Sequence, residues 1–375
     1  MRNEAENIKK TAMLVACASV LQIAEFLLPS PLPGVKLGLA NIVTLVVLSE
    51  LGFKAALEVA ILRTVVSSLI VGTFLSPTFL MSLSGAFVST LVMGSIYKIF
   101  GLISVSVIGS VTHIAVQMLL VYLLLIKNTA VFLMLPWLGL SAVIMGWLTG
   151  LIAIQVINKL RSGETESFKD TSGPVSPLAS KLYLNTGSKL HAFPATAKIF
   201  ISLILMVLVL LFSNAYFYSV VFIFLLLLGT VSKVPAGKLF SGIIKLRFFL
   251  IFSFIIPALF GGGNHTLFEY GFLKVTVEGC FTGVMFVYRL AALMLITSLM
   301  MTTTAPEALA ESLKKYFGER VSRVMTLSWS YVPIFWEKSN RYIRSHKVDG
   351  KLFGKVLPIA VSLLVMLYME TEKYE

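Results

Sequence analysis

Long apolar runs separated by short polar breaks make up most of this chain, and one polar stretch is far longer than the others. It spans Lys159 to Lys198 and is rich in charged residues, Ser, Thr, Gly and Pro. Such a composition cannot bury enough apolar surface to offset the entropy lost on ordering, so it predicts a solvated linker. We therefore expect two membrane units, residues 1–158 and 190–375, joined by a polar linker at 159–189. A long loop inside one membrane fold is the alternative.

The first block predicts six membrane-spanning helices, because its apolar runs are close to the length of about 20 residues that crosses a bilayer. Placing most Lys and Arg residues on the cytosolic side puts the N-terminus and the linker in the cytosol, with Lys36 and Lys127 as exceptions. The expected spans are about 10–29, 36–51, 53–75, 77–98, 102–126 and 130–157.

The composition is that of a membrane protein. Hydrophobic residues make up 57% of the chain and charged residues 13%, whereas average soluble domains carry about 25% charged residues. The net charge of +13 comes mostly from Lys and Arg in the polar breaks, so it gives no reason to expect nucleic acid as a partner. Cys17 and Cys280 both lie in apolar runs, and we expect no disulfide framework, no metal site and no cofactor.

Polar side chains within the first block gather between the middle and the expected outer side of the membrane. Arg63 lies about 15 Å deep on the third span, where an ionised side chain costs about 2.5–3.5 kcal/mol on insertion scales. Glu58 is expected to pair with Lys54 at i, i+4, so Arg63 needs a partner on another helix or a cavity. These positions predict a substrate-binding pocket open to the exterior, with an internal hydrogen-bond network as the alternative. The candidate residues are Gln22, Glu25, Lys36, Asn41, Arg63, His113 and Gln117.

The second block predicts four apolar runs followed by amphipathic helices. Arg289 lies near the centre of the fourth run, where it either ties helices together or contacts substrate. From about residue 305 to 350, an apolar stripe with helical spacing lies beside charged residues, which is typical of helices that lie on a membrane surface or bind a partner. The loop 261–279 is polar enough to lie outside the membrane. The four runs are about 189–214, 216–231, 246–260 and 280–301.

The first block contains three distinctive segments: PLPGVKLGLANIVTL at 31–45, LRTVVSSLIVGTFLSPTFLMSLSGAFVSTLVM at 62–93 and GSVTHIAVQ at 109–117. They resemble the Gx transporter family, which is also labelled heptaprenyl diphosphate synthase component I. The resemblance implies the S component of an energy-coupling factor (ECF) transporter, a six-helix subunit that captures a small molecule. It also implies docking through small residues of the first helix, and Ala12 and Ala16 have the small-xxx-small spacing that lets helices approach closely.

The enzyme label does not agree with the residues. A prenyl diphosphate synthase needs clustered aspartates to hold magnesium against diphosphate oxygens. The two aspartates of the sequence, Asp170 and Asp349, have no acidic neighbours. We expect that the chain is not an enzyme, and an accessory membrane subunit of prenyl diphosphate or quinone synthesis is an alternative function.

The second block also contains three distinctive segments: KLHAFPATAK at 189–198, VEGCFTGVMFVYRLAALML at 277–295 and TTTAPEALAESLKK at 302–315. They resemble the T component of the same transporters, the cobalt-transporter Q-like family. The resemblance implies that helices at about 305–350 receive motion from ABC-type ATPase subunits. The family's Ala-Arg-Gly motif corresponds here to Val348-Asp349-Gly350. The candidate coupling residues are Ala12, Ala16, Arg289, Glu307, Arg341 and Arg344.

These patterns predict an all-α integral protein of the cell membrane, with a six-helix S-component-like bundle, a T-component-like unit of four to five membrane helices, and cytosolic amphipathic coupling helices. The expected function is capture of a small molecule and movement driven by ATPase subunits supplied in trans, because the sequence contains no G-x-x-x-x-G-K-[ST] phosphate loop. In the family mechanism the S unit binds substrate outside and topples against the T unit to release it inside. Vitamins, flavin-like molecules and isoprenoid or quinone precursors are the substrate classes that the family suggests. An ATP-independent carrier is a further alternative.

Overall fold

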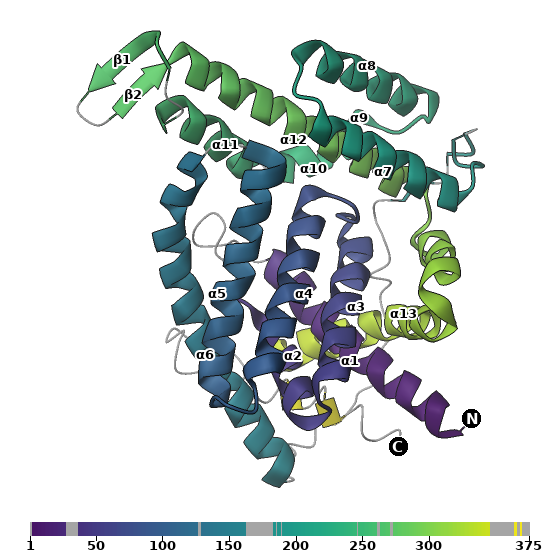
Figure 1. Cartoon of the computed structure of the whole chain (residues 1–375). Coiled ribbons are helices and arrows are strands. Elements are labelled where there is room, and N and C mark those ends of the chain that lie inside the picture. The colour runs from purple at the N-terminus through teal and green to yellow at the C-terminus, as the bar shows by residue number, and fades with distance from the viewer. Residues whose placement is uncertain are drawn as a thin grey trace.

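The chain folds into helices and one short β-hairpin, as the computed structural model in Figure 1 shows. This architecture confirms the predicted all-α fold class. The structure describes residues 2–27, 37–126, 129–162, 183–184, 186–188, 190–245, 247–260, 263–270, 273–345, 364–365 and 368–369.

Six α-helices of the N-terminal part lie where the apolar runs predict them. The helix of the second run is shorter than expected, because it begins only after Gly38, whose left-handed backbone (φ 74°) suits glycine. Its 12 residues span about 18 Å, which is less than the thickness of a bilayer core. The elements are α1 (Arg2–Leu27), α2 (Leu39–Glu50), α3 (Phe53–Val71), α4 (Pro77–Ile96), α5 (Leu102–Leu120), the π-helix η1 (Val121–Ile126), the 3₁₀-helix η2 (Thr129–Met134) and α6 (Leu135–Ser162).

The C-terminal part contains the four predicted apolar helices, which are α7, α8, α11 and α12, and the predicted amphipathic region, which is α13. Gly318 has a positive φ of 81° with ψ 167° and divides α13 into two helical segments, in keeping with the two amphipathic helices expected from the sequence. The bounds are α7 (Ala195–Leu211), α8 (Ala215–Val231), α9 (Ala236–Leu239), α10 (Ser241–Lys245), α11 (Arg247–Phe260), β1 (Thr266–Tyr270), β2 (Leu273–Thr276), α12 (Val277–Thr303) and α13 (Pro306–Ser345).

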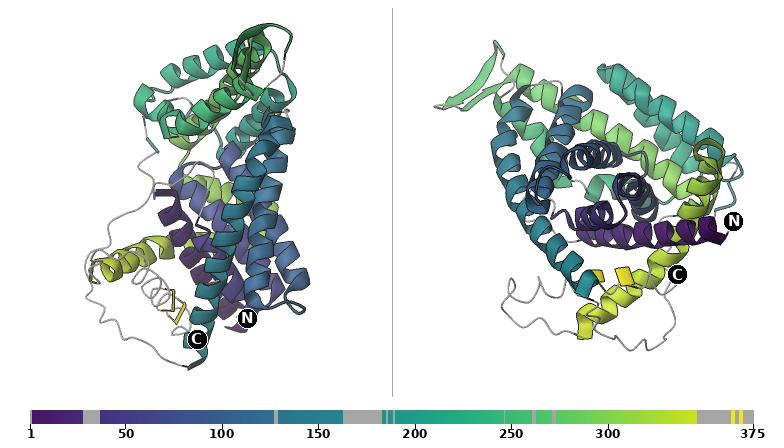
Figure 2. Two further views of the ribbon diagram at one scale, coloured as in Figure 1. Left: turned by 90° about the vertical axis from the view of Figure 1, so that its left-hand side faces the viewer. Right: turned by 60° about the horizontal axis from the view of Figure 1, so that its bottom comes forward.

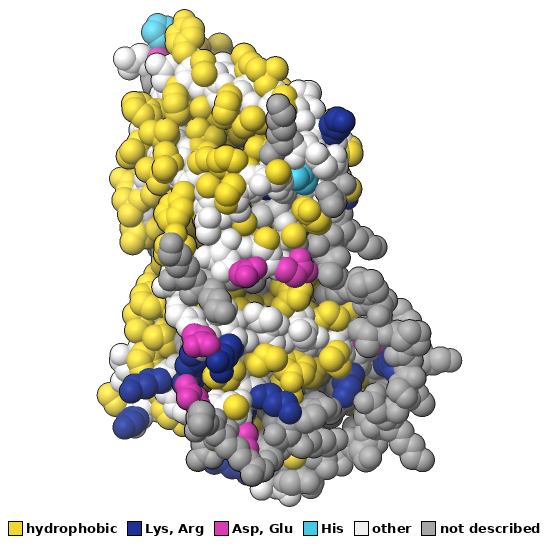
Figure 3. Space-filling model, turned by 90° about the vertical axis from the view of Figure 1, so that its right-hand side faces the viewer, with side chains coloured by type: hydrophobic (Ala, Val, Ile, Leu, Met, Phe, Trp, Pro, Cys, Tyr) yellow, Lys and Arg dark blue, Asp and Glu magenta, His cyan; other side chains and the backbone are white. Residues whose placement is uncertain are grey.

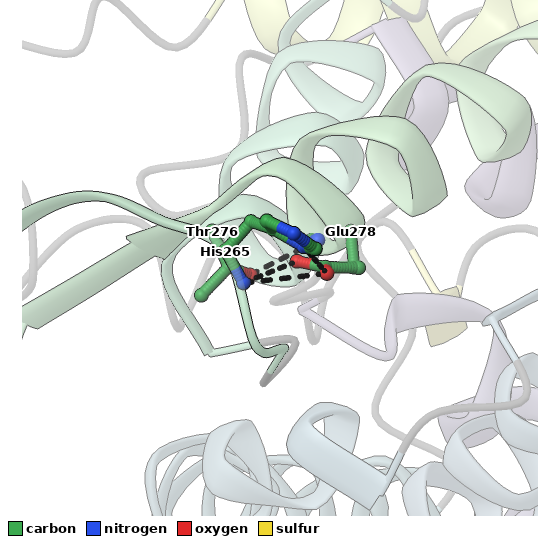
Figure 4. Close-up of polar contacts among 4 residues, drawn as sticks. His265, Thr276 and Glu278 are labelled. Carbon is green, nitrogen blue, oxygen red and sulfur yellow. Dashed lines mark hydrogen bonds and ion pairs between the residues drawn. The ribbon is translucent and has the colours of Figure 1, made fainter.

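The loop between α11 and α12 holds an antiparallel hairpin that the sequence analysis missed. Its base is joined to the start of α12 (Figure 4). The Oε1 atom of Glu278 lies 2.9 Å from Nδ1 of His265, and Oγ1 of Thr276 accepts a hydrogen bond from the backbone N–H of Gly279 at 3.1 Å. Thr276 therefore caps α12, and Glu278 places a negative charge at the positive end of the helix dipole.

The two parts of the chain pack against each other along several elements. Helix α13 contacts α1 and α3, while α12 contacts α4 and η1. In the right-hand view of Figure 2, several helices of the N-terminal bundle are seen close to end-on, whereas α12 is seen along its length. The two sets of helices therefore run in different directions.

Much of the apolar surface remains exposed. Among the described residues, four helices are long and apolar enough to cross a membrane: Pro77–Ile96, Leu102–Leu125, Val131–Ser162 and Val277–Thr303. On α8, Tyr216, Val220 and Leu227 are 83%, 66% and 59% exposed, which suits contact with lipid. Figure 3 shows hydrophobic side chains over the upper part of one face and charged side chains gathered in its lower part.

Candidate functional site

A cavity of about 70 Å³ lies within the N-terminal bundle and is lined by residues of α1 to α6. Six of the seven residues predicted for a binding pocket lie around it, namely Gln22, Glu25, Asn41, Arg63, His113 and Gln117. The seventh, Lys36, lies outside the described residues. The structure therefore brings the predicted residues together, and their role in binding remains a prediction.

Arg63 is the buried cation of this cavity, with 4% of its surface exposed. Its Nη1 donates to Oε1 of Gln22 at 3.3 Å, and its Nη2 donates to Oδ1 of Asn41 at 2.7 Å. The predicted need for partners on other helices is met, since these residues lie on α1 and α2. Its Nε has no hydrogen-bond partner among the described residues. A buried unsatisfied donor costs about 1–3 kcal/mol, so a ligand acceptor at this position would be favoured.

Glu25 also lines the cavity, and a backbone N–H group holds its carboxylate in place. Its Oε1 accepts a hydrogen bond from the N–H of Gly38 at 2.6 Å. The left-handed conformation of Gly38 presents this N–H to the carboxylate just before α2 begins. Among the described residues, no ion pair joins Glu25 to Arg63. The guanidinium of Arg63 is therefore fixed by neutral amides rather than by a carboxylate.

His113 and Gln117 line the cavity from α5. Nε2 of Gln117 lies 3.0 Å from Nε2 of His113, as their i, i+4 spacing predicts. The imidazole packs flat against α4 at Gly85, where an added Cβ would lie 2.8–3.0 Å from three ring atoms. A glycine at this position is therefore what lets the ring occupy its place.

Sequence analysis missed several hydroxyl groups in the lining. They come from α3, α4, α5 and α6, and the apolar lining beside them is mostly small. A signal was present on α5, where Ser110, His113 and Gln117 share one helical face at i, i+3 and i+7. The missed polar residues are Thr64, Ser82, Ser110 and Ser141.

The small-residue face of α1 packs against α13. Ala12 and Ala16 are both 0% exposed, and Oγ of Ser328 shares its hydrogen between the backbone carbonyls of Ala12 at 2.9 Å and Val324 at 2.6 Å. Since this contact joins residues 316 positions apart, it links the two predicted units. Small side chains allow the two backbones to approach to hydrogen-bonding distance.

A second contact between the parts corrects an expectation from the sequence. Glu58 does not pair with Lys54; it forms a two-pronged ion pair with Arg320 on α13, with Nε–Oε1 at 3.3 Å and Nη2–Oε2 at 3.1 Å. The side chains of Arg320 and Glu58 are 52% and 22% exposed, so water weakens the pair.

Arg289 makes the third contact between the parts. It is 6% exposed, and its Nε donates to the hydroxyl of Tyr218 at 2.7 Å. Its Nη1 donates across the interface to the carbonyl of Leu125 at 2.7 Å, and its Nη2 bonds Ser213. These contacts are those of a tie between helices, one of the two roles that the sequence left open for Arg289.

The remaining predicted coupling residues lie on α13. Glu307 is exposed in its first turn, and Nε of Arg341 pairs with Oε1 of Glu337 at 3.1 Å. The side chain of Arg344 and the Val348-Asp349-Gly350 segment lie outside the described residues.

The helices, their exposed apolar surfaces and the buried polar cavity define a multi-pass α-helical membrane protein. Residues 14–156 match the family model described as heptaprenyl diphosphate synthase component I, and residues 186–367 match the one described as cobalt transport protein. The resemblance of the two blocks to these two families is thereby confirmed.

Relatives in several bacteria match the C-terminal half. The chain is 29% identical over 196 residues to the energy-coupling factor transporter transmembrane protein EcfT of Acidaminococcus fermentans, covering 49% of this chain and 73% of that protein. It is 27% identical over 196 residues to EcfT of Thermosediminibacter oceani, covering 49% and 74%. It is 23% identical over 208 residues to EcfT of Listeria innocua, covering 51% and 78%. These relatives are named as transporter components rather than enzymes.

Proposed function

We propose that the chain is the membrane subunit of an energy-coupling factor type transporter. In this proposal, residues 1–158 capture a small molecule, residues 190–375 form the coupling unit, and the polar linker 159–189 joins them in the cytosol. ABC-type ATPase subunits supplied in trans provide the energy. The similarity of the C-terminal half to transmembrane components of such transporters supports the second unit.

The packing of α1 on α13 is the observation that carries this proposal. The docking face expected from the first resemblance, at Ala12 and Ala16, lies against the helices expected to receive motion in the second. The hydroxyl of Ser328, which is shared with the carbonyl of Val324 in its own helix, lies 2.9 Å from the carbonyl oxygen of Ala12, so the two helices are in close contact. In the proposed transporter, docking of a capture unit on a coupling unit takes place within one polypeptide.

The different directions of the helices support a docked state after release. Helices α4, α5, α6 and α12 are each long and apolar enough to cross a bilayer, yet α4–α6 run up the view in Figure 1 while α12 runs across it. The cavity of about 70 Å³ is far smaller than the roughly 300–1,000 Å³ of pockets for drug-sized ligands. We therefore assign this structure to a state in which the capture bundle has tilted and its pocket has contracted.

The test is purification of the full chain from its native host in mild detergent, followed by reconstitution into vesicles. We expect ABC-type ATPase subunits to co-purify, and uptake to require ATP. Co-purification of a soluble prenyl synthase without any ATPase would instead favour the accessory role in prenyl or quinone synthesis. Uptake that continues without nucleotide would favour the ATP-independent carrier.

A further inference from the structure

One donor of the Arg63 side chain, which lines the cavity, is a buried Nε–H without a partner among the described residues. Both terminal nitrogens of Arg63 are held by the amide oxygens of Gln22 and Asn41, whereas Nε has no partner among the described residues. Each terminal nitrogen carries two N–H groups. A free N–H on Nε beside a second N–H on a terminal nitrogen forms a planar two-donor edge, which matches the two oxygens of a carboxylate.

Glu25, the carboxylate among the described lining residues, does not bond this edge. Glu25 is bound through Oε1 to the backbone N–H of Gly38 at 2.6 Å, and no ion pair among the described residues joins it to Arg63. Arg63 is therefore an almost fully buried cation whose hydrogen-bonded side-chain partners, Gln22 and Asn41, are neutral. Glu25 acts on Arg63 electrostatically without a direct ion pair, so an acidic group on the ligand would be the charged partner that contacts the guanidinium directly.

The chemistry of the remaining lining favours a hydrogen-bonding molecule. His113 and Gln117 face the cavity from α5, and hydroxyl groups of Ser82, Ser110 and Ser141 lie in the same lining. The described lining residues include no Phe, Tyr or Trp, and such rings are the usual platform for stacking a flat fused-ring ligand.

We propose that the captured molecule is a small carboxylate without a fused aromatic ring, whose carboxylate pairs with the Nε edge of Arg63 while its remaining polar groups meet His113, Gln117 and the hydroxyls. This substrate class rests on the proposed function, because it takes the cavity as the capture site. It sets aside the flavin-like and isoprenoid diphosphate substrates that the family suggests. A diphosphate brings several negative charges, and Arg63 is the one cation among the described lining residues.

The experiment measures ligand binding to the purified full chain in lipid nanodiscs by thermal stabilisation. The probes share a five-carbon skeleton: pentanoate, 5-aminopentanoate, 5-hydroxypentanoate and pentane-1,5-diol. Riboflavin and isopentenyl diphosphate represent the two competing classes. We expect at least one carboxylate to bind about tenfold or more tightly than the diol, in line with a charge-assisted two-pronged contact. No stabilisation by any carboxylate, or stabilisation by riboflavin or isopentenyl diphosphate alone, would overturn the proposal.

Variants locate the contact. Arg63→Lys keeps the positive charge but lacks the planar two-donor edge of the guanidinium. The variant should therefore lose most of the preference for carboxylate over diol. Arg320→Lys, which lies on α13 outside the cavity lining, should retain it. Comparing the ligands on the unaltered chain tests the proposed substrate class even where an Arg63 variant does not fold. Binding needs no ATPase, so a failure here is distinct from a failure of the transporter proposal, which co-purification and ATP-dependent uptake test.

Discussion

Arg289 on α12 donates a hydrogen bond to the carbonyl oxygen of Leu125 in η1, 164 residues away, at 2.7 Å. Carbonyls at the C-terminal end of a helix lack partners within the helix, and a cation there also meets the negative end of the helix dipole. Since η1 continues directly from α5, which carries His113 and Gln117, one helical segment leads from the cavity to this contact. A ligand that shifts α5 would therefore also shift the acceptor of Arg289.

Replacing Arg289 should loosen the contact between the two parts. Arg289→Gln removes hydrogen bonds from a charged donor, each of which is worth about 1.5–3 kcal/mol. Leu124 and Met206 line one small apolar cavity between the parts, so cysteines at these positions, in a chain lacking Cys17 and Cys280, report docking by cross-linking. We expect severalfold slower cross-linking in Arg289→Gln and a smaller effect in Arg289→Lys. Unchanged rates in both would show that Arg289 does not hold the interface.

Gly85→Ala should disturb the cavity without adding any polar group. The new Cβ would lie 2.8–3.0 Å from the ring of His113, so the imidazole must move away from its position beside Gln117. We expect about tenfold weaker ligand binding and a loss of about 1–3 kcal/mol in stability from overpacking. Gly139→Ala is the matched control, because nothing lies within 4 Å of its added Cβ. Equal binding in the two variants would count against a role for His113.

Ala12→Leu should force α1 away from α13. Ala12 is 0% exposed and its carbonyl accepts from Ser328, so extra methyl groups have no room and cost about 1–3 kcal/mol. The expected result is less ATP-driven uptake with normal insertion into the membrane. Val220→Leu on the exposed side of α8, where 66% of the side chain is exposed, should leave uptake unchanged. Equal uptake in both variants would argue against docking through this face.

The ion pair between Glu58 and Arg320 should contribute modestly and depend on salt. An exposed pair is worth about 0.2–1 kcal/mol and is screened at high ionic strength. Arg320→Glu should weaken docking in the cross-linking assay at low salt and much less at about 1 M salt. The double exchange of Glu58→Arg with Arg320→Glu should restore it. Failure of the exchange to restore docking would mean that the effect of Arg320 does not pass through Glu58.

Rules that use only neighbouring residues in the sequence correctly predicted the local features of this structure. Apolar runs of membrane length gave the positions of the helices, and the cost of intramembrane polar groups identified Arg63, while i, i+4 spacing paired His113 with Gln117. The same spacing rule gave the wrong partner for Glu58, because a residue 262 positions away competes successfully with Lys54. The spacing of residues along the chain does not reveal partners that are far apart in the sequence.

The hairpin and the length of α2 were missed for a related reason. Both depend on a few backbone angles at short connections, such as the positive φ of Gly38, and hydrophobic periodicity does not report those angles. The sequence indicated the cavity because polar side chains in the apolar runs are energetically unfavourable in contact with lipid. Its volume depends on how the helices pack, which composition alone does not determine.

The different directions of α4–α6 and α12 (Figure 1) have a mechanical consequence for the surrounding lipid. When α12 stands along the bilayer normal, the N-terminal helices must lie closer to the membrane plane, and their polar connections then meet hydrocarbon unless the bilayer deforms around them. Such mismatch costs fractions of a kcal/mol per Å. In the proposed transporter, acyl-chain length and bilayer stiffness should therefore affect how readily the N-terminal bundle tilts.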